Sequence, residues 1–137
     1  MGSLMVSLAN STSPRTMSWK RRGASGMRAC VAYERSLGDR FLAGLKRMNS
    51  ARLFGSPTME GRVPTFAFTL QGHTPQDVQR HLAQNGIFSW SGSFYAVETV
   101  ARLGLANQGG LVRVGLCHYN TAEEVDQLLT ALGDFTD

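Results

Sequence analysis

A strand pattern followed at once by a helix start constrains the fold of this chain most. Residues 63–70, VPTFAFTL, alternate large apolar with smaller side chains, which is typical of a half-buried strand. Thr74 then stands as an N-cap residue, with Pro75 at the first helical position and Asp77 three residues after the cap. The segment 63–85 is therefore predicted to be a strand that turns directly into a helix.

The same arrangement recurs near the C-terminus. Residues 111–117 form a second apolar strand pattern, and Thr121 with Glu124 makes a reciprocal capping box. The buried side of the helix that follows is predicted to consist of Val125, Leu128, Leu129 and Leu132. Two units of strand and helix in one short chain point to a sheet covered by helices.

The remaining elements extend this order. A long helix over residues 24–48 is predicted to bury one stripe, made of Met27, Val31, Leu37, Phe41, Leu42, Leu45 and Met48. A loop with Gly55, Pro57 and Gly61 is expected to follow. A short strand at 87–90 and a turn at 91–93 should lead into a helical stripe of Tyr95, Val97, Val100 and Ala101. The order helix, strand, helix, strand, helix, strand, helix favours an α/β class fold, an α+β two-layer sandwich with helices packed on one small sheet.

Charge is distributed unevenly along the chain. The net charge is +4, but residues 1–30 carry five basic residues and no acidic one, so nine basic residues face all ten acidic ones in the remainder. A nucleic-acid interface needs basic residues gathered on a structured face, so no nucleic-acid partner is expected. Every apolar run is shorter than the roughly 18 residues of a membrane-spanning helix, so no membrane association is expected.

The N-terminal segment 1–20 is rich in Ser, Thr and Asn and lacks apolar periodicity. We predict a disordered leader there, and a transit peptide is the alternative reading of its acid-free, Arg- and Ser-containing composition.

Cysteine and histidine spacing argues against a metal site. Cys30 and Cys117 are far apart and belong to no CxxC motif, which favours a reducing, cytoplasmic location. His73, His81 and His118 lack the spacing of metal ligands. We expect Cys117 to be a small core residue and His81 to occupy a surface position of its helix.

Arg113 is the one candidate site residue. Its guanidinium interrupts the apolar run 111–116, and an unpaired buried charge is costly, so it must face solvent, an internal acid or a ligand. If Arg113 faces solvent or an internal acid, its role is structural. The third possibility is a bidentate clamp on an anionic substrate, which the planar guanidinium suits well.

Several segments, taken in order, carry a wider pattern: RVPTFAF at 62–68, GHTP at 72–75, GIFSWSGSFYA at 86–96 and VRVGLCHYNTAEEVD at 112–126. Together they closely resemble the C-terminal part of cysteine desulfurase-like proteins of the class V aminotransferase superfamily. The resemblance runs from about residue 21 to the end, and YERSL at 33–37 is similar to the helix that joins the family's large cofactor domain to its small domain.

The resemblance implies a fold type I, pyridoxal-phosphate-dependent parent enzyme that acts on an amino acid, with a homodimer as the usual assembly. Arg113 matches the family arginine that holds the substrate carboxylate. The segment from Ser89 to Tyr95 corresponds to the loop that carries the sulfur-accepting cysteine of true cysteine desulfurases. It contains no cysteine, so sulfur transfer through a persulfide is not expected.

The cofactor lysine of the family has no counterpart, because neither Lys20 nor Lys46 lies in a matching motif. We therefore predict a truncated homologue: a linking helix over 21–50 and a small C-terminal domain over 51–137. It should be inactive alone, with no catalytic, cofactor-binding or metal-binding residue of its own. The alternative is a non-catalytic, stand-alone interaction module that pairs through the stripe of helix 24–48.

Overall fold

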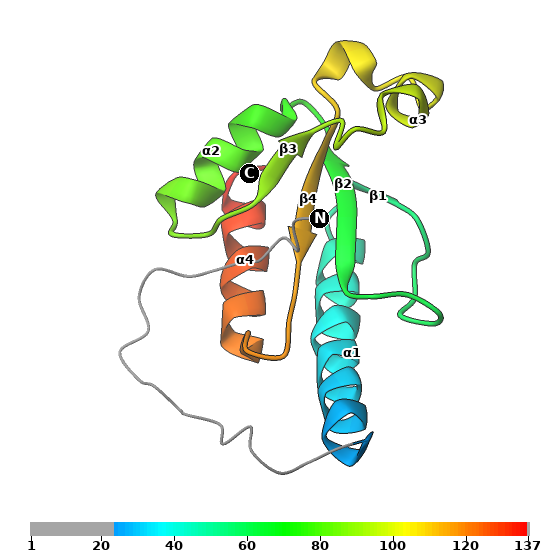
Figure 1. The fold of residues 1–137 in the computed structure, drawn as a ribbon. Helices are drawn as coiled ribbons and strands as arrows, with labels where there is room; N and C mark the ends of the chain where they lie inside the picture. Colours follow the sequence, from blue (N-terminus) through cyan, green and yellow to red (C-terminus); the bar gives the residue numbers. More distant parts are fainter. Residues whose placement is uncertain (1–23, 137) are drawn as a thin grey trace.

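The structure is a computed structural model that describes residues 24–136 (Figure 1). The leader predicted at 1–20 lies outside the described residues. The elements follow the order α1 (Ala24–Lys46), β1 (Ala51–Phe54), β2 (Thr65–Leu70), α2 (Pro75–Gln84), β3 (Trp90–Gly92), α3 (Val97–Arg102), the 3-10 helix η1 (Ala106–Gln108), β4 (Leu111–Gly115) and α4 (Ala122–Asp134).

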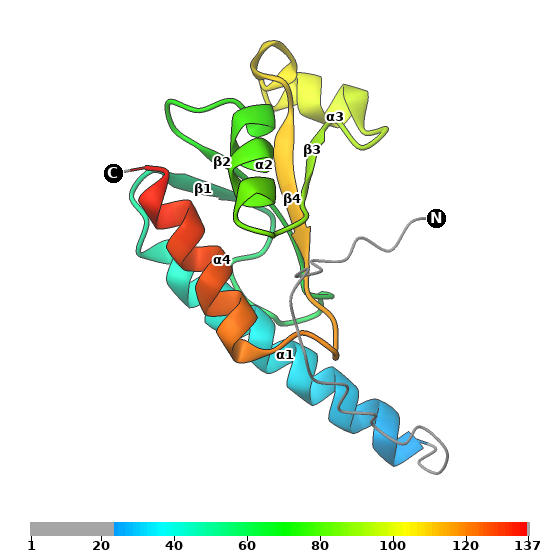
Figure 2. The ribbon, with the colours of Figure 1, turned by 90° about the vertical axis from the view of Figure 1, so that its left-hand side faces the viewer.

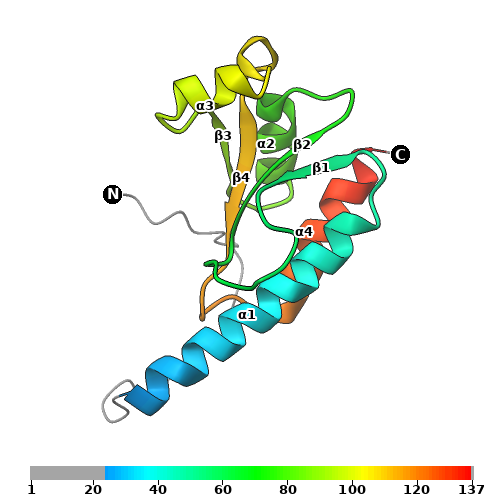
Figure 3. The same cartoon turned by 90° about the vertical axis from the view of Figure 1, so that its right-hand side faces the viewer.

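The four strands form one antiparallel sheet in the order β1-β2-β4-β3. Helices α1, α2 and α4 pack on one face of it, as Figures 1 and 2 show. The other face has no layer of long helices among the described residues; α3 and η1 stand at one end of the sheet (Figure 3). The predicted two-layer arrangement of helices on one small sheet is confirmed.

The core lies between the sheet and the three helices. Alternate residues of β2, Phe66 and Phe68, are fully buried, as the period of two requires. Phe41 of α1 is also fully buried, and its ring centroid lies 4.7 Å from that of Phe66 and 6.0 Å from that of Phe68. These three rings join the long helix to the centre of the sheet.

Both predicted helix starts are present. The side chain of Thr74 accepts a hydrogen bond from the Asp77 backbone at 3.2 Å. The Thr121 side chain accepts from the Glu124 backbone at 3.2 Å, while the Glu124 carboxylate accepts from the Thr121 backbone at 3.1 Å. The reciprocal capping box is therefore complete.

Three expectations about the strands and the short helix are wrong. β1 lies at residues 51–54, just before the expected glycine- and proline-containing loop, and the sequence did not indicate it. β3 lies at Trp90–Gly92 rather than 87–90, because its pairing with β4 brings Gly92 opposite Leu111. The helical stripe predicted from Tyr95 onward is not buried as a stripe, because Val100 is its one buried member and Tyr95 is fully exposed.

The stripe predicted along α1 is correct only in its C-terminal half. Leu37 and Phe41 are buried, but Met27 is 69% exposed and Val31 is 58% exposed. Figures 2 and 3 show the reason, since the first turns of α1 extend past the end of the sheet and of α4. No helix among residues 24–136 combines the length and apolar character that crossing a membrane requires.

An ion pair joins α1 to α4 and makes their packing sensitive to acid. Arg40 donates from Nε and from a terminal nitrogen to the two carboxylate oxygens of Asp126, each at 2.6 Å. The hydrogen bond from Arg40 holds the pKa of Asp126 below its ordinary value of 3.8. Because the folded-state pKa is lowered, the stabilisation is present above that ordinary value and is lost as the pH falls through the folded-state value.

The Asp126→Asn variant is therefore expected to melt at a lower temperature than the wild type at neutral pH. That difference should shrink as the pH is lowered below about 4, where the wild-type carboxylate also loses its charge. Circular dichroism melts between pH 2 and 7 measure it. Asp134→Asn, at the end of the same helix, is the control, and equal pH dependence of the two variants would contradict the assignment.

Candidate functional site

Arg113 lies in the middle of β4 and points to the open face of the sheet. Its neighbours Val112 and Val114 are fully buried, and Arg113 itself is half-buried. Because side chains alternate along a strand, Arg113 faces away from the core beneath α1, α2 and α4. The fold therefore resolves the conflict of a charge within an apolar run by directing it to the opposite face.

Strand register places Arg113 in a row that crosses all four strands. Phe54 is paired with Ala67, Ala67 with Arg113, and Arg113 with Trp90. Directly opposed residues of antiparallel strands share a face, so these four side chains form one line, which we call the Arg113 row. Ala67 is small and leaves room beside the guanidinium, whereas Trp90 is 56% exposed and forms the outer end of the row.

The guanidinium has no acidic partner within residues 24–136. Its side chain takes part in none of the ion pairs or side-chain hydrogen bonds of that part of the chain. Its contact is with an aromatic ring, since Cζ lies 5.5 Å from the ring centroid of Phe94. The reading in which an internal acid neutralises Arg113 thus finds no support in the described part of the chain.

A second arginine lies on the same face. Arg52 of β1 is paired with Thr69 of β2, two residues along from Ala67, and its Cζ lies 4.9 Å from the ring centroid of Phe54. Within residues 24–136 no acid pairs with Arg52 either. Two unpaired guanidiniums give the open face a local positive charge that suits an anionic ligand.

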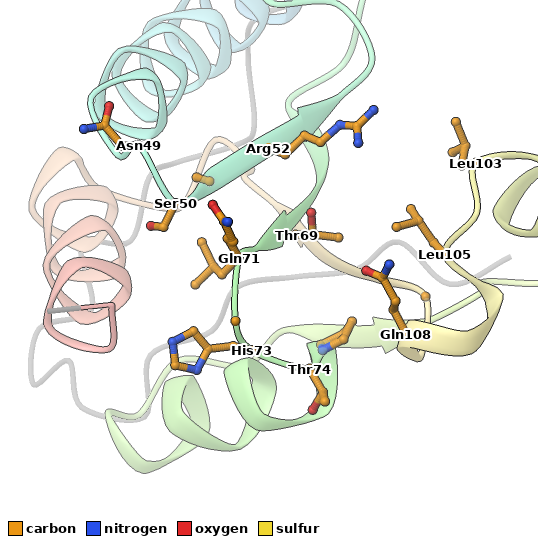
Figure 4. A pocket seen from close by; sticks show the side chains of 15 residues that line it. Asn49, Ser50, Arg52, Thr69, Gln71, His73, Thr74, Leu103, Leu105 and Gln108 are labelled. Atoms are coloured by element: carbon orange, nitrogen blue, oxygen red, sulfur yellow. The ribbon is translucent and has the colours of Figure 1, made fainter.

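A shallow groove of about 580 Å³ lies at the strand pair Arg52 and Thr69 (Figure 4). It runs between β1, the start of α2 and the segment around η1, with Arg52, Thr69 and Leu105 among its lining residues. Arg113 does not line it. The groove and the Arg113 row are therefore neighbouring parts of one face, and the groove does not by itself enclose the predicted site residue.

The loop after β4 holds one of the two cysteines, Cys117, and one of the three histidines, His118. Cys117 is half-buried, so the expectation that it is a core residue is wrong. Glu34 of α1 accepts a hydrogen bond from the backbone of His118 at 2.9 Å, and its Oε1 lies 3.2 Å from Nδ1 of that imidazole. These contacts tie the loop to α1.

The other two histidines lie against Phe135, near the C-terminus. The ring centroid of Phe135 is 4.3 Å from that of His73 and 4.4 Å from that of His81. His81 is partly buried, with Nε2 2.8 Å from the carbonyl oxygen of Ala131, so its predicted surface position is wrong. Within the described ranges, no three potential ligands gather in a way that could hold a metal ion.

Sequence reasoning missed two members of this face. Phe94 belongs to an aromatic segment whose composition favours packing, and only the fold shows its ring over Arg113. Ala67 carries no chemical signal at all, because its importance comes from its place opposite Arg113. Strand register places Ala67, the turn after β3 places Phe94, and a single sequence contains neither.

Comparison with known proteins identifies the family. The model of the aminotransferase class-V family matches residues 18–128. The chain belongs to the class V aminotransferases. The class V match includes α1, every strand and most of α4, so the Arg113 row lies inside the matched region.

Relatives of this class V chain include a probable cysteine desulfurase 2 of Mycobacterium leprae, which is 31% identical over 80% of this chain and 25% of its own length. An aminotransferase-like protein of Gibberella zeae is 32% identical over 76% of this chain and 27% of its own length. The chain thus spans about a quarter of the length of these two curated relatives.

Solved structures agree with the class V assignment. The apo structure of a cysteine desulfurase from Thermococcus onnurineus superposes with a TM-score of 0.74 at 25% identity, over 81% of this chain and 27% of that one. A cysteine desulfurase from Escherichia coli gives a TM-score of 0.64 at 26% identity, over 75% of this chain and 24% of that one. The resemblance to cysteine desulfurase-like proteins and the fold type I assignment are confirmed.

The class V family depends on pyridoxal phosphate. Such a site needs a lysine for the Schiff base and backbone N–H groups for the phosphate. Lys46, the one lysine among the described residues, is exposed at the end of α1, and α1 covers the face opposite Arg113. The described residues therefore do not fit the lysine role, and we assign no step through the cofactor to this chain.

Proposed function

We propose that this chain forms the small C-terminal domain, with its linking helix, of a pyridoxal-phosphate-dependent class V enzyme, and that Arg113 binds the α-carboxylate of an amino-acid substrate. The linking helix corresponds to residues 21–50 and the small domain to residues 51–137. The remainder of the enzyme would supply the cofactor, as a homodimer in a reducing, cytoplasmic setting. Alone, the chain is expected to be inactive.

One observation carries this proposal. Arg113 lies on the open face of the sheet, between Ala67 and Trp90, with no acid partner in the described part of the chain. Sheet geometry does not require a charge at this position, and an aliphatic residue would suit a half-buried strand better. A guanidinium left without an acid can donate two parallel hydrogen bonds to a carboxylate.

The absence of cysteine in the segment from Ser89 to Tyr95 bears on the reaction. A persulfide intermediate needs a thiol, and this segment offers serine, glycine and aromatic side chains instead. We therefore propose a transferase or lyase reaction other than sulfur transfer through this loop.

The proposal is tested with the 137-residue chain carrying Trp19→Phe, so that Trp90 is its only tryptophan. Trp90 fluorescence is followed during titration with L-alanine and, as matched control, with L-alaninamide, which lacks the carboxylate. Only L-alanine is expected to give a saturable change. Arg113→Gln should weaken its binding at least about tenfold, since a charged hydrogen bond contributes about 1.5–3 kcal/mol.

Arg113→Lys should fall between the wild type and Arg113→Gln, because it keeps the charge and loses the two-pronged geometry. Binding by a single domain will be weak, so the ratio between variants is the informative quantity. Equal binding of L-alanine and L-alaninamide, or unchanged binding in Arg113→Gln, would contradict the carboxylate role.

The exposed half of α1 supports a second candidate function. Met27 and Val31 are both more than half exposed on a helix that extends beyond the sheet. Such a surface suits a non-catalytic module that pairs with another chain. Sedimentation velocity separates the two candidate functions. Pairing through α1 requires a dimer that Val31→Lys dissociates, whereas carboxylate binding by Arg113 does not require a dimer.

A further inference from the structure

The turn between β3 and α3 holds two consecutive non-glycine residues in the left-handed region. Phe94 has φ 52° and Tyr95 has φ 62°. Side chains with a Cβ are disfavoured there, and such strain persists only where the surrounding structure enforces it. Because both residues have this strained backbone, the packing of their two side chains shows which contact the turn provides.

Tyr95 gains no packing from its conformation. Its side chain is fully exposed, with a relative accessibility of 104%. Phe94, in contrast, is partly buried against a small cluster formed by Val100, Leu105 and Leu111. The strained turn therefore places one aromatic ring on the protein surface and the other in solvent.

The packed ring of Phe94 also lies over Arg113. The distance of 5.5 Å from Cζ to the ring centroid is within the range of a cation–π contact. An aromatic ring is not a conventional hydrogen-bond acceptor, so a cation–π contact leaves the N–H donors of the guanidinium available to a carboxylate. The contact thus limits the orientations of Arg113 without using the donors that a carboxylate needs.

We infer that Phe94 is a positioning residue for Arg113. Its ring restricts the positions that the guanidinium takes on the open face, so that less conformational freedom is lost when a carboxylate binds. This inference rests on the proposed function of Arg113 as the carboxylate-binding residue. The strain of the turn is explained as the cost of bringing Phe94 over the Arg113 row.

Three variants of the 137-residue chain separate the ring from the backbone. Phe94→Asn removes the ring and keeps a residue that tolerates the left-handed region. Phe94→Tyr keeps the ring. Tyr95→Asn makes the matched change at the neighbouring position of similar φ. Circular dichroism melts verify that each variant is folded.

Two readouts are recorded for each variant. The Nε–Hε signal of Arg113 in NMR spectra reports ring position and side-chain order without any ligand. Titration with L-alanine reports carboxylate affinity. In Phe94→Asn we expect the Arg113 signal to shift and its order to fall, and the affinity to drop about two- to fivefold. Phe94→Tyr and Tyr95→Asn should match the wild type in both readouts.

The possible failures can be told apart. If Arg113→Gln weakens L-alanine binding while Phe94→Asn does not, the positioning role is wrong and the carboxylate role stands. If Arg113→Gln also leaves binding unchanged, the proposed function fails, and the positioning role fails with it. A loss in Phe94→Asn that Tyr95→Asn reproduces would show that the turn, and not the ring, is responsible, which also overturns the inference.

Discussion

Replacing Phe41 with alanine is expected to lower the free energy of unfolding by about 3–5 kcal/mol. Phe41 is fully buried, and its ring lies between α1 and the two phenylalanines of β2, at 4.7 Å from Phe66 and 6.0 Å from Phe68. Removing it leaves a cavity at the place where the long helix meets the centre of the sheet. The surrounding side chains are close-packed and cannot all move inward to fill it.

Urea denaturation followed by circular dichroism measures this loss. The matched control is Val31→Ala on the same helix, where the side chain is 58% exposed and the expected change is below about 0.5 kcal/mol. A loss below about 1 kcal/mol in Phe41→Ala would contradict the placement of α1 on the sheet.

Gly110→Ala is expected to destabilise the fold by about 2–5 kcal/mol and to disturb the Arg113 row. Gly110 has φ +91°, and a Cβ added there would lie 2.5 Å from the carbonyl carbon of Gly92. That contact is with the backbone of β3, so no side-chain rotation relieves it. β3 must shift instead, and Trp90 moves with it away from Arg113.

The control for this prediction is Gly104→Ala. Gly104 has φ +72° but no atom within 4 Å of the added Cβ, so only backbone strain of about 1–2 kcal/mol is expected. Urea denaturation gives the two free energies of unfolding, and with Trp19→Phe also present the Trp90 emission maximum reports movement of β3. Equal losses in the two variants would show that the close approach of Gly110 to β3 is not significant.

Local signals predicted the parts of the fold that depend on neighbouring residues. The caps at Thr74 and Thr121 and the alternation in β2 are each determined within a few positions of sequence. The orientation of Arg113 away from the core follows from the same alternation in β4. These features need no knowledge of what lies across the sheet.

Long-range pairing determined the features that the sequence did not predict. β1 has only four residues, and Arg52 in its second position gives it no clear apolar pattern. Its strand conformation comes from pairing with β2. The exposed half of α1 also has regularly spaced apolar residues, and it is exposed because the first turns of α1 extend past the end of the sheet and of α4.

The candidate site also combines a residue that the local sequence indicates with residues that only long-range pairing brings together. Arg113 was identified from one residue type in an apolar run, whereas its neighbours come from two other segments of the chain, Ala67 from β2 and both Trp90 and Phe94 from residues 90–94. Only strand register and an unusual turn bring them together. A single sequence contains no record of either, since positive φ is ordinarily indicated by glycine or asparagine and this turn has aromatic residues.

Mapping of amino-acid binding by NMR tests the central claim most directly. Backbone amide and arginine side-chain signals of the 137-residue chain are followed while L-alanine is added, with L-alaninamide as the control. We predict that the L-alanine-specific changes centre on Arg113 and its row neighbours Ala67 and Trp90. Changes centred on Arg52 and Gln108 in the groove, or the same changes with L-alaninamide, would contradict Arg113 as the carboxylate-binding residue.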